Sequence, residues 1–162
     1  MLSIKLLKKT AELLSLCQYK KIKIATAESC TGGLLAAHLT EIAGASSVFI
    51  HGFITYSNEA KINFLDVPAV LLKKYGAVSQ QAAYAMAHGC IKKTQTDLVI
   101  SVTGIAGPDG GSDQKPIGTV YFCGLNSINY SIEKHYIFKG NRTDIRLNAV
   151  KEALEILYNL AK

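Results

Sequence analysis

Residues 21–43 read KIKIATAESCTGGLLAAHLTEIA, and this stretch decides the fold class. Its first part, residues 21–27, is a short run with β-branched side chains, which predicts a strand. Its last part, residues 34–43, is rich in leucine and alanine, which predicts a helix that packs closely on a sheet. Between them, residues 28–33 (ESCTGG) form a glycine-rich turn. A strand that passes through such a turn into a helix is typical of α/β proteins.

The same alternation continues along the chain. We expect helices over residues 3–17 (with Ser3 as the N-cap), 34–43, 58–66, 70–75, 80–93 and from Asn141 or Thr143 to residue 160. We expect strands over residues 21–27, 48–56, 97–103, 118–125 and 130–138, the last two as a hairpin. This order predicts an α/β fold in three layers, an α/β/α sandwich with a mixed sheet between helices. With no linker or repeat in sight, residues 1–162 are expected to form a single domain.

Composition narrows the classes of function. The chain has 162 residues, a net charge of +6 and a hydrophobic share of 49%. Its lysine pairs are scattered and not interleaved with aromatic residues, so we expect no nucleic-acid binding, while the positive charge favours a small anionic ligand. Four isolated cysteines indicate neither a metal site nor disulfides. Without a signal peptide or a membrane-spanning run, we expect a cytoplasmic protein with no membrane partner.

Two glycine-rich loops follow predicted strands and are the best candidates for a binding site. The first is the turn at residues 28–33, and the second runs from Gly104 to Ser112 (GIAGPDGGS). Ligands of open α/β sheets bind at the carboxyl ends of strands, so both loops are expected to face one crevice. Gly32 and Gly33 are expected to leave backbone N–H groups free at a helix start, where an oxyanion or phosphate can bind.

Ser29 is the candidate nucleophile, and it needs a neighbouring base. The four histidines fall within predicted helices or strands, so a Ser-His-Asp triad lacks support, although it stays open. Lys61 is better placed, because it follows the second strand in the segment Tyr56 to Lys61 (YSNEAK), and serine–lysine enzymes are known. Cys30, beside Ser29, is the alternative nucleophile.

Four segments together resemble the CinA C-terminal domain family. They are TAESCTGGLLAAHLTEIAGAS at residues 26–46, the pattern F-x-x-G-F-I-T-Y-S-N-E-A-K at residues 49–61, AVSQQAA at residues 77–83, and SVTGIAGPDGGSDQKPIGTVYF at residues 101–122. Their order and spacing are similar to those of the family, and the resemblance extends from residue 21 to the last helix. Stand-alone members of this family are nicotinamide-nucleotide amidases, and this chain, without the amino-terminal domain of longer CinA proteins, resembles them.

The resemblance implies hydrolysis of nicotinamide mononucleotide to nicotinate mononucleotide and ammonia, in pyridine nucleotide recycling. It implies Ser29 as the nucleophile, Lys61 as the base and Tyr56 as their catalytic neighbour. Residues expected to contact the substrate are Cys30, Thr31, Gly32 and Gly33 in the first turn, Thr103, Gly104, Gly107, Gly110 and Gly111 in or before the second loop, and Arg142 in the segment Gly140-Asn141-Arg142. Arginine suits the phosphate because it forms bidentate contacts.

No metal or other cofactor is expected, and the partner is the nucleotide substrate. The alanine-faced helices favour a homo-oligomer. Two other functions fit the same loops: a nucleotide- or phosphate-binding module without catalysis, for instance a competence- or damage-associated one, or an amidase for another carboxamide nucleotide.

Overall fold

The computed structural model describes residues 4–162, so the expected cap Ser3 lies outside the described part. A five-stranded sheet with the order β2-β1-β3-β4-β5 forms the centre of the molecule. Strand β1 (Ile24–Glu28) runs parallel to both β2 (Phe49–Ile54) and β3 (Leu98–Gly104). Strands β4 (Thr119–Asn126) and β5 (Ser131–Ile137) continue the sheet in antiparallel fashion. The predicted mixed sheet with a carboxyl-terminal hairpin is thereby confirmed.

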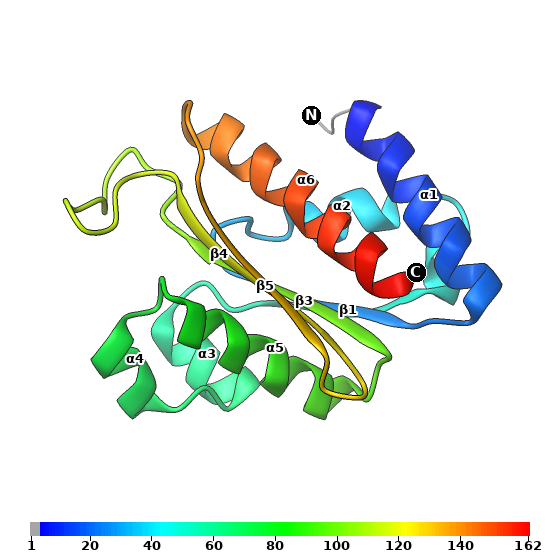
Figure 1. The fold of residues 1–162 in the computed structure, drawn as a ribbon, viewed down its shortest axis with the longest axis horizontal. Coiled ribbons are helices and arrows are strands. Elements are labelled where there is room, and N and C mark those ends of the chain that lie inside the picture. The colour runs from blue at the N-terminus through cyan, green and yellow to red at the C-terminus, as the bar shows by residue number, and fades with distance from the viewer. Residues whose placement is uncertain (1–3) are drawn as a thin grey trace.

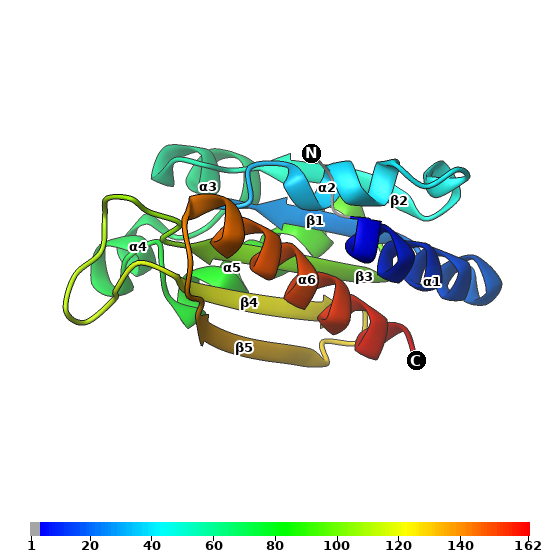
Figure 2. The ribbon, with the colours of Figure 1, turned by 90° about the horizontal axis from the view of Figure 1, so that it is seen from above.

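Within residues 4–162 there are six α-helices. They cover the two faces of the sheet, as Figures 1 and 2 show. On one face lie α1 (Ile4–Lys20), α2 (Leu34–Thr40) and α6 (Arg142–Ala161). On the other lie α3 (Asn58–Leu65), α4 (Ala69–Tyr75) and α5 (Gln80–Thr94). A 3-10 turn (Ala45–Ser47) precedes β2. The three-layer α/β/α arrangement is therefore confirmed.

Strand β3 explains why two separate cores can share one sheet. Its alternate side chains point to opposite faces: Ile100 and Val102 pack with α1, α2 and α6, while Val99 packs with α3, α4 and α5. On the second face α5 approaches α3 so closely that a Cβ built on Gly89 would lie 1.8 Å from the backbone oxygen of Leu65. Only glycine permits this contact, which fixes the position of α3 and of the residues it carries.

Two elements end at least two residues earlier than the sequence predicts. The second strand ends at Ile54 rather than at Tyr56. The helix expected over residues 34–43 ends at Thr40, whose hydroxyl donates to the carbonyl oxygens of Ala36 and Ala37. Such side-chain bonds compete with the backbone hydrogen bonds of the helix. Gly44, which has a left-handed φ of 81°, then caps the 3-10 turn that begins at Ala45.

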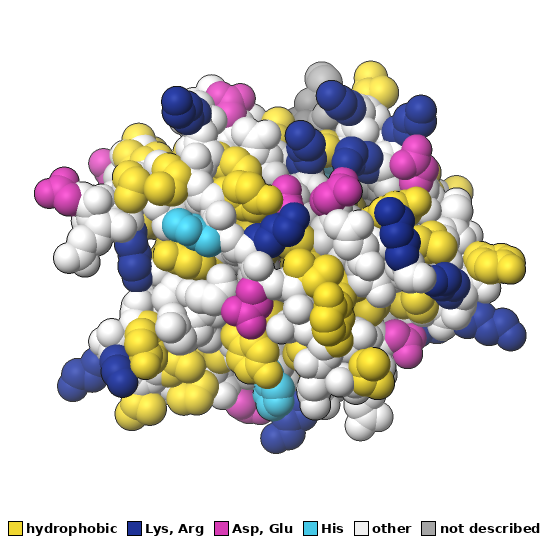
Figure 3. Space-filling model, viewed as in Figure 1, with side chains coloured by type: hydrophobic (Ala, Val, Ile, Leu, Met, Phe, Trp, Pro, Cys, Tyr) yellow, Lys and Arg dark blue, Asp and Glu magenta, His cyan; other side chains and the backbone are white. Residues whose placement is uncertain are grey.

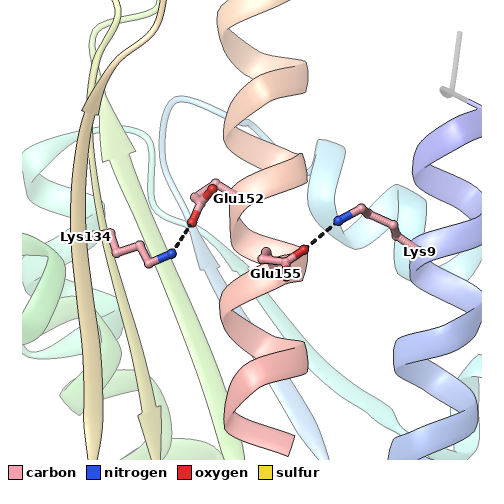
Figure 4. Close-up of polar contacts among 4 residues, drawn as sticks. All are labelled: Lys9, Lys134, Glu152 and Glu155. Atoms are coloured by element: carbon pink, nitrogen blue, oxygen red, sulfur yellow. Dashed lines mark hydrogen bonds and ion pairs between the residues drawn. The ribbon is translucent and has the colours of Figure 1, made fainter.

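Helix α6 carries Arg142 at its first position, so its placement matters for the site. Asn141 is its N-cap: the side-chain oxygen accepts from the Thr143 and Asp144 amides, and the Asp144 carboxylate accepts from the Asn141 amide. Figure 4 shows two ion pairs along the helix, from Lys134 of β5 to Glu152 (2.7 Å) and from Lys9 of α1 to Glu155 (2.5 Å). Each is partly exposed and is worth about 1 kcal/mol or less.

Charge on the surface follows the scattered pattern of the sequence. Figure 3 shows lysine and arginine side chains gathered over α1, and acidic and apolar side chains between them elsewhere on this face. Among residues 4–162, no helix combines the length and the apolar character needed to cross a bilayer.

Candidate functional site

Ser29 lies directly after β1, in a turn whose geometry is set by backbone hydrogen bonds. The Ser29 amide donates to the carbonyl oxygen of Val102 in β3 (2.9 Å), and the Gly32 amide donates to the carbonyl oxygen of Ser29 (2.9 Å). Gly32 at φ 55° and Gly33 at φ 87° are both left-handed, a conformation that glycine adopts without strain. The side chain of Ser29 is thus held at the carboxyl end of the parallel strands, where the sequence places it.

Glu28 occupies the helix start that the sequence analysis assigned to a ligand. Its fully buried carboxylate accepts hydrogen bonds from the amides of Gly33 (3.0 Å), Leu35 (3.1 Å) and Ala36 (2.9 Å). The expectation that the Gly32 and Gly33 amides are free is therefore wrong. The amides of Cys30 and Thr31, in contrast, donate to no other residue within residues 4–162. They are the donors left for an oxyanion.

Lys61 lies on α3, which follows β2, and its side chain reaches Ser29 at the end of the neighbouring strand β1. Ser57 caps α3 through a bond from the Ala60 amide, and Lys61 follows on the first turn with only 1% of its surface exposed. Its Nζ lies 3.0 Å from Ser29 Oγ, 2.8 Å from the carbonyl oxygen of Thr55 and 3.5 Å from that of Tyr56. If the amine is neutral, its two N–H groups can serve the two carbonyls, and its lone pair is left for the Ser29 hydroxyl.

Burial makes that neutral form accessible. Removal from water lowers the pKa of Lys61 from 10.5 to about 8, and a weaker effect of Cys30 acts in the opposite direction. No carboxylate forms an ion pair with Lys61 in the described part of the chain. A lysine with its pKa near neutrality, in contact with a serine hydroxyl, has the properties of a general base.

Tyr56 and Arg142 lie together at the mouth of the site. Arg142 donates through Nη2 to the Tyr56 hydroxyl (2.9 Å) and through Nη1 to the carbonyl oxygen of Gly107 (2.8 Å). Both side chains are exposed, Tyr56 by 58%. The arginine thereby links the second glycine-rich loop to the segment that follows β2, and several of its N–H groups remain for a ligand.

These groups surround one pocket of about 170 Å³. Thr103, at the end of β3, helps to shape it by donating to the carbonyl oxygen of Ala77 (2.8 Å). The lining residues are Ser29, Cys30, Tyr56, Lys61, Ala77, Val78, Thr103, Gly104, Ala106 and Arg142. The prediction that both loops face one crevice is confirmed. Of the residues expected at the site, Thr31, Gly32, Gly33, Gly107, Gly110 and Gly111 do not line the pocket.

Cys30 and the histidines are poorer candidates for the chemistry. Burial raises the pKa of the Cys30 thiol to about 12, and no base contacts it within residues 4–162. His38 is fully buried on α2, where its Nδ1 lies 2.7 Å from the carbonyl oxygen of Leu34, and no histidine lines the pocket. Ser29 is the only pocket nucleophile among the described residues with a base in contact.

Sequence reasoning missed Glu28 and a second arginine, Arg146, which donates to the carbonyl oxygen of Thr31 (2.7 Å). Glu28 stands five residues before the first amide that it binds, and a carboxylate just before a helix start is a recognisable signal. Arg146 stands four residues after Arg142 on a predicted helix, hence on the same face. In the described part of the chain, no cluster of three His, Cys, Asp or Glu side chains could hold a metal ion.

Comparison with known proteins places this geometry in a family. Residues 7–161 match the family described as "CinA C-terminal domain". The chain belongs to the CinA C-terminal domain family. A CinA-like protein of Leptospira biflexa is 51% identical over 145 residues, which are 89% of this chain and 34% of that protein. A CinA-like protein of Geobacter sulfurreducens is 49% identical over 138 residues, 85% of this chain and 33% of that protein.

This CinA C-terminal domain also matches solved structures over their full length. The competence/damage inducible protein CihA of Agrobacterium tumefaciens superposes with a TM-score of 0.98 at 39% identity, covering 100% of this chain and 99% of that one. A CinA superfamily protein of Escherichia coli has a TM-score of 0.91 at 33% identity, covering 99% and 94%. The chain spans about a third of the length of the curated relatives that it matches.

Proposed function

We propose that this CinA domain is an amidase that hydrolyses nicotinamide mononucleotide, with Ser29 as the nucleophile and Lys61 as the general base. The observation that carries the proposal is the 3.0 Å contact between Lys61 Nζ and Ser29 Oγ, inside a pocket that excludes Lys61 from water. Without a base in contact, a serine hydroxyl is a weak nucleophile.

Acylation of Ser29 is the first half of the reaction. Ser29 Oγ attacks the carboxamide carbon while Lys61 Nζ takes the hydroxyl proton. The carbonyl oxygen becomes an oxyanion, which is stabilised by the amides of Cys30 and Thr31, since these donate to no other residue within residues 4–162. The C–N bond then breaks, the nitrogen leaves as ammonia after it receives a proton from Lys61, and the acyl group remains as an ester on Ser29. Tyr56 lines the same pocket, which supports a role for its hydroxyl in the relay of that proton.

Deacylation repeats the steps with water. Lys61, neutral again, takes a proton from a water molecule that attacks the ester carbon. Collapse of the second oxyanion breaks the bond to Ser29 Oγ, which recovers its proton from Lys61. The acid that forms gives its proton to the solvent, where the released ammonia can take it up, so the products are a carboxylate, here nicotinate mononucleotide, and ammonium. Such a reaction returns nicotinamide nucleotides to pyridine nucleotide synthesis.

The size of the pocket supports a substrate that is only partly enclosed. Pockets that hold a whole drug-sized ligand usually measure about 300–1,000 Å³, whereas this one measures about 170 Å³. A pyridine carboxamide fits such a volume, and the ribose phosphate then extends to the mouth, where Arg142 is exposed. The free N–H groups of Arg142 suit a phosphate.

An ammonia-release assay with nicotinamide mononucleotide tests the proposal. Ser29→Ala is expected to abolish release while calorimetry still detects binding of the nucleotide. Ser127→Ala, in the exposed hairpin turn between β4 and β5, is the matched control and is expected to keep full activity. Near-normal turnover by Ser29→Ala would contradict the proposed nucleophile. Binding without turnover in the unmodified chain would favour the non-catalytic module.

A further inference from the structure

Arg146, near the carboxyl end of the chain, contacts the turn at residues 29–32, which carries the candidate nucleophile Ser29. It lies one helical turn after Arg142 on α6, so both arginines face the same way. The two have different targets, however. Arg142 binds the Tyr56 hydroxyl and Gly107 at the exposed mouth, whereas Arg146 Nη2 donates to the carbonyl oxygen of Thr31 at 2.7 Å.

Among residues 4–162 the positive charge of Arg146 has no ion-pair partner. Its buried Nε also has no hydrogen-bond acceptor within these residues. A buried donor without an acceptor and a charge without a counter-ion both cost stability. An arrangement of this kind, next to a candidate nucleophile, indicates that the charge serves the site rather than the stability of the fold.

The hydrogen bond from Arg146 limits the movement of one peptide group. The carbonyl oxygen of Thr31 also accepts from the Leu34 amide (3.1 Å), and the N–H of the same peptide, on Gly32, donates to Ser29 (2.9 Å). The buried Thr31 hydroxyl makes no hydrogen bond within residues 4–162. The bond from Arg146 is therefore the contact that joins Thr31 to a distant part of the chain. Rotation of the Thr31–Gly32 peptide would break all three bonds.

That anchored turn is the one that holds the candidate oxyanion donors. In a turn closed by a bond from Gly32 to Ser29, the two central amides belong to Cys30 and Thr31, and these amides donate to no other residue within residues 4–162. Their direction depends on the conformation of the turn. Fixed donors stabilise an oxyanion better than mobile ones, because no reorganisation is needed during the reaction.

The charge of Arg146 also reaches the pocket. Burial is the main influence on the Cys30 thiol and raises its pKa to about 12; the negative charge of Glu28 acts in the same direction, while the positive charges of Lys61 and Arg146 act to lower it. Cys30 lines the pocket beside Ser29. The positive charge of Arg146 therefore acts at the place where negative charge develops when a carbonyl group is attacked, and its own contribution there is favourable.

We infer that Arg146 is a positioning residue for the reaction at Ser29: its guanidinium holds the Ser29–Gly32 turn in place and puts a positive charge against the carbonyl oxygen of Thr31 in that turn. The inference rests on the proposed amidase function and gives the two arginines of α6 separate tasks. Arg142 binds substrate, and Arg146 acts on the transition state through the turn.

The test compares Arg146→Met and Arg146→Lys with Lys151→Met, which removes an exposed charge from the same helix. Arg146→Met is expected to lower kcat for nicotinamide mononucleotide by about 10- to 100-fold with KM little changed, less than the ~100- to 1000-fold loss typical for an oxyanion donor itself. Arg146→Lys, which keeps the charge, is expected to recover part of kcat. Lys151→Met is expected to match the unmodified chain.

Amide hydrogen exchange of the folded variants gives a second readout that needs no turnover. The Gly32 amide is expected to exchange slowly in the unmodified chain and in Lys151→Met, and faster in Arg146→Met. An active chain in which Arg146→Met keeps its kcat would overturn the inference and leave the amidase proposal standing. If the unmodified chain releases no ammonia, the amidase proposal fails, and unchanged Gly32 exchange would then overturn the positioning role as well.

Discussion

The amine of Lys61 lies 3.0 Å from the hydroxyl of Ser29, although 32 residues separate them in the chain. The contact follows from the pairing of β1 with β2. These strands run parallel and end side by side, with Glu28 opposite Ile54. Ser29 follows the first strand directly, and Lys61 follows the second by one capped helical turn. Two neighbouring strand ends therefore bring together the proposed nucleophile and its proposed base without a long loop.

The rate of hydrolysis should depend on pH through Lys61. The reaction needs the neutral amine, and burial lowers the pKa of Lys61 to about 8. We expect kcat/KM to rise about tenfold per pH unit below that value and to level off above it. Ammonia release measured from about pH 6 to 9.5 checks this. A profile without change over this range would contradict a lysine base.

Replacement of Lys61 by arginine separates charge from basicity. Arginine keeps a cation near Ser29 but stays protonated at any working pH, so it cannot accept the hydroxyl proton. We expect Lys61→Arg to lose activity nearly as completely as Ser29→Ala. Lys73→Arg, on the exposed end of α4, is the control and should retain full activity. Substantial turnover by Lys61→Arg would exclude the proposed role.

Stability should respond to Lys61 in a defined pH window. The pKa of Lys61 is lower in the folded chain, about 8, than its ordinary value of 10.5. Between these values the unfolded chain binds more protons, so the free energy of unfolding rises with pH there and is constant below about 8. Lys61→Met lacks this contribution. The free energy of unfolding of the unmodified chain, minus that of Lys61→Met, should increase by about 2 kcal/mol between pH 7 and pH 9.5. Urea titrations at both pH values measure it, and a constant difference would contradict the shift.

Periodicity and turn chemistry predicted most of this fold, since every expected strand and helix within residues 4–162 is present. Neither could predict which hydrogen-bond partner a particular backbone amide or carbonyl group has. Gly32 and Gly33 indicate an open helix start, but the Gly33 amide donates to the carboxylate of Glu28, earlier in the chain, and the Gly32 amide donates to the carbonyl oxygen of Ser29. Likewise, the contact from Arg146 to Thr31 joins residues 115 positions apart, and no local pattern specifies it.

Glu28 should contribute to both stability and activity. Its Oε2 accepts from the Gly33 and Leu35 amides, and its Oε1 accepts from the Ala36 amide. Glu28→Gln keeps one acceptor oxygen but turns an NH₂ group toward a backbone donor. The unpaired buried donor should cost about 1–3 kcal/mol of unfolding free energy. Because the same bonds hold the Ser29 turn, kcat should also fall, whereas Glu41→Gln, exposed after α2, should change neither. Unchanged unfolding by Glu28→Gln would contradict this role.

The preference for a phosphorylated substrate should depend on Arg142 and not on Ser29 and Lys61. Arg142 is exposed at the mouth and bonded only to Tyr56 and Gly107 among residues 4–162. If it binds the phosphate equally in the ground and transition states, Arg142→Ala should raise KM for nicotinamide mononucleotide about 10-fold or more and leave kcat nearly unchanged. With nicotinamide riboside, which has no phosphate, the same substitution should have little effect on KM. Comparison of the two substrates on both proteins therefore isolates the phosphate contact. Equal losses on both would instead assign Arg142 to the support of Tyr56, because both substrates need that residue in the same place.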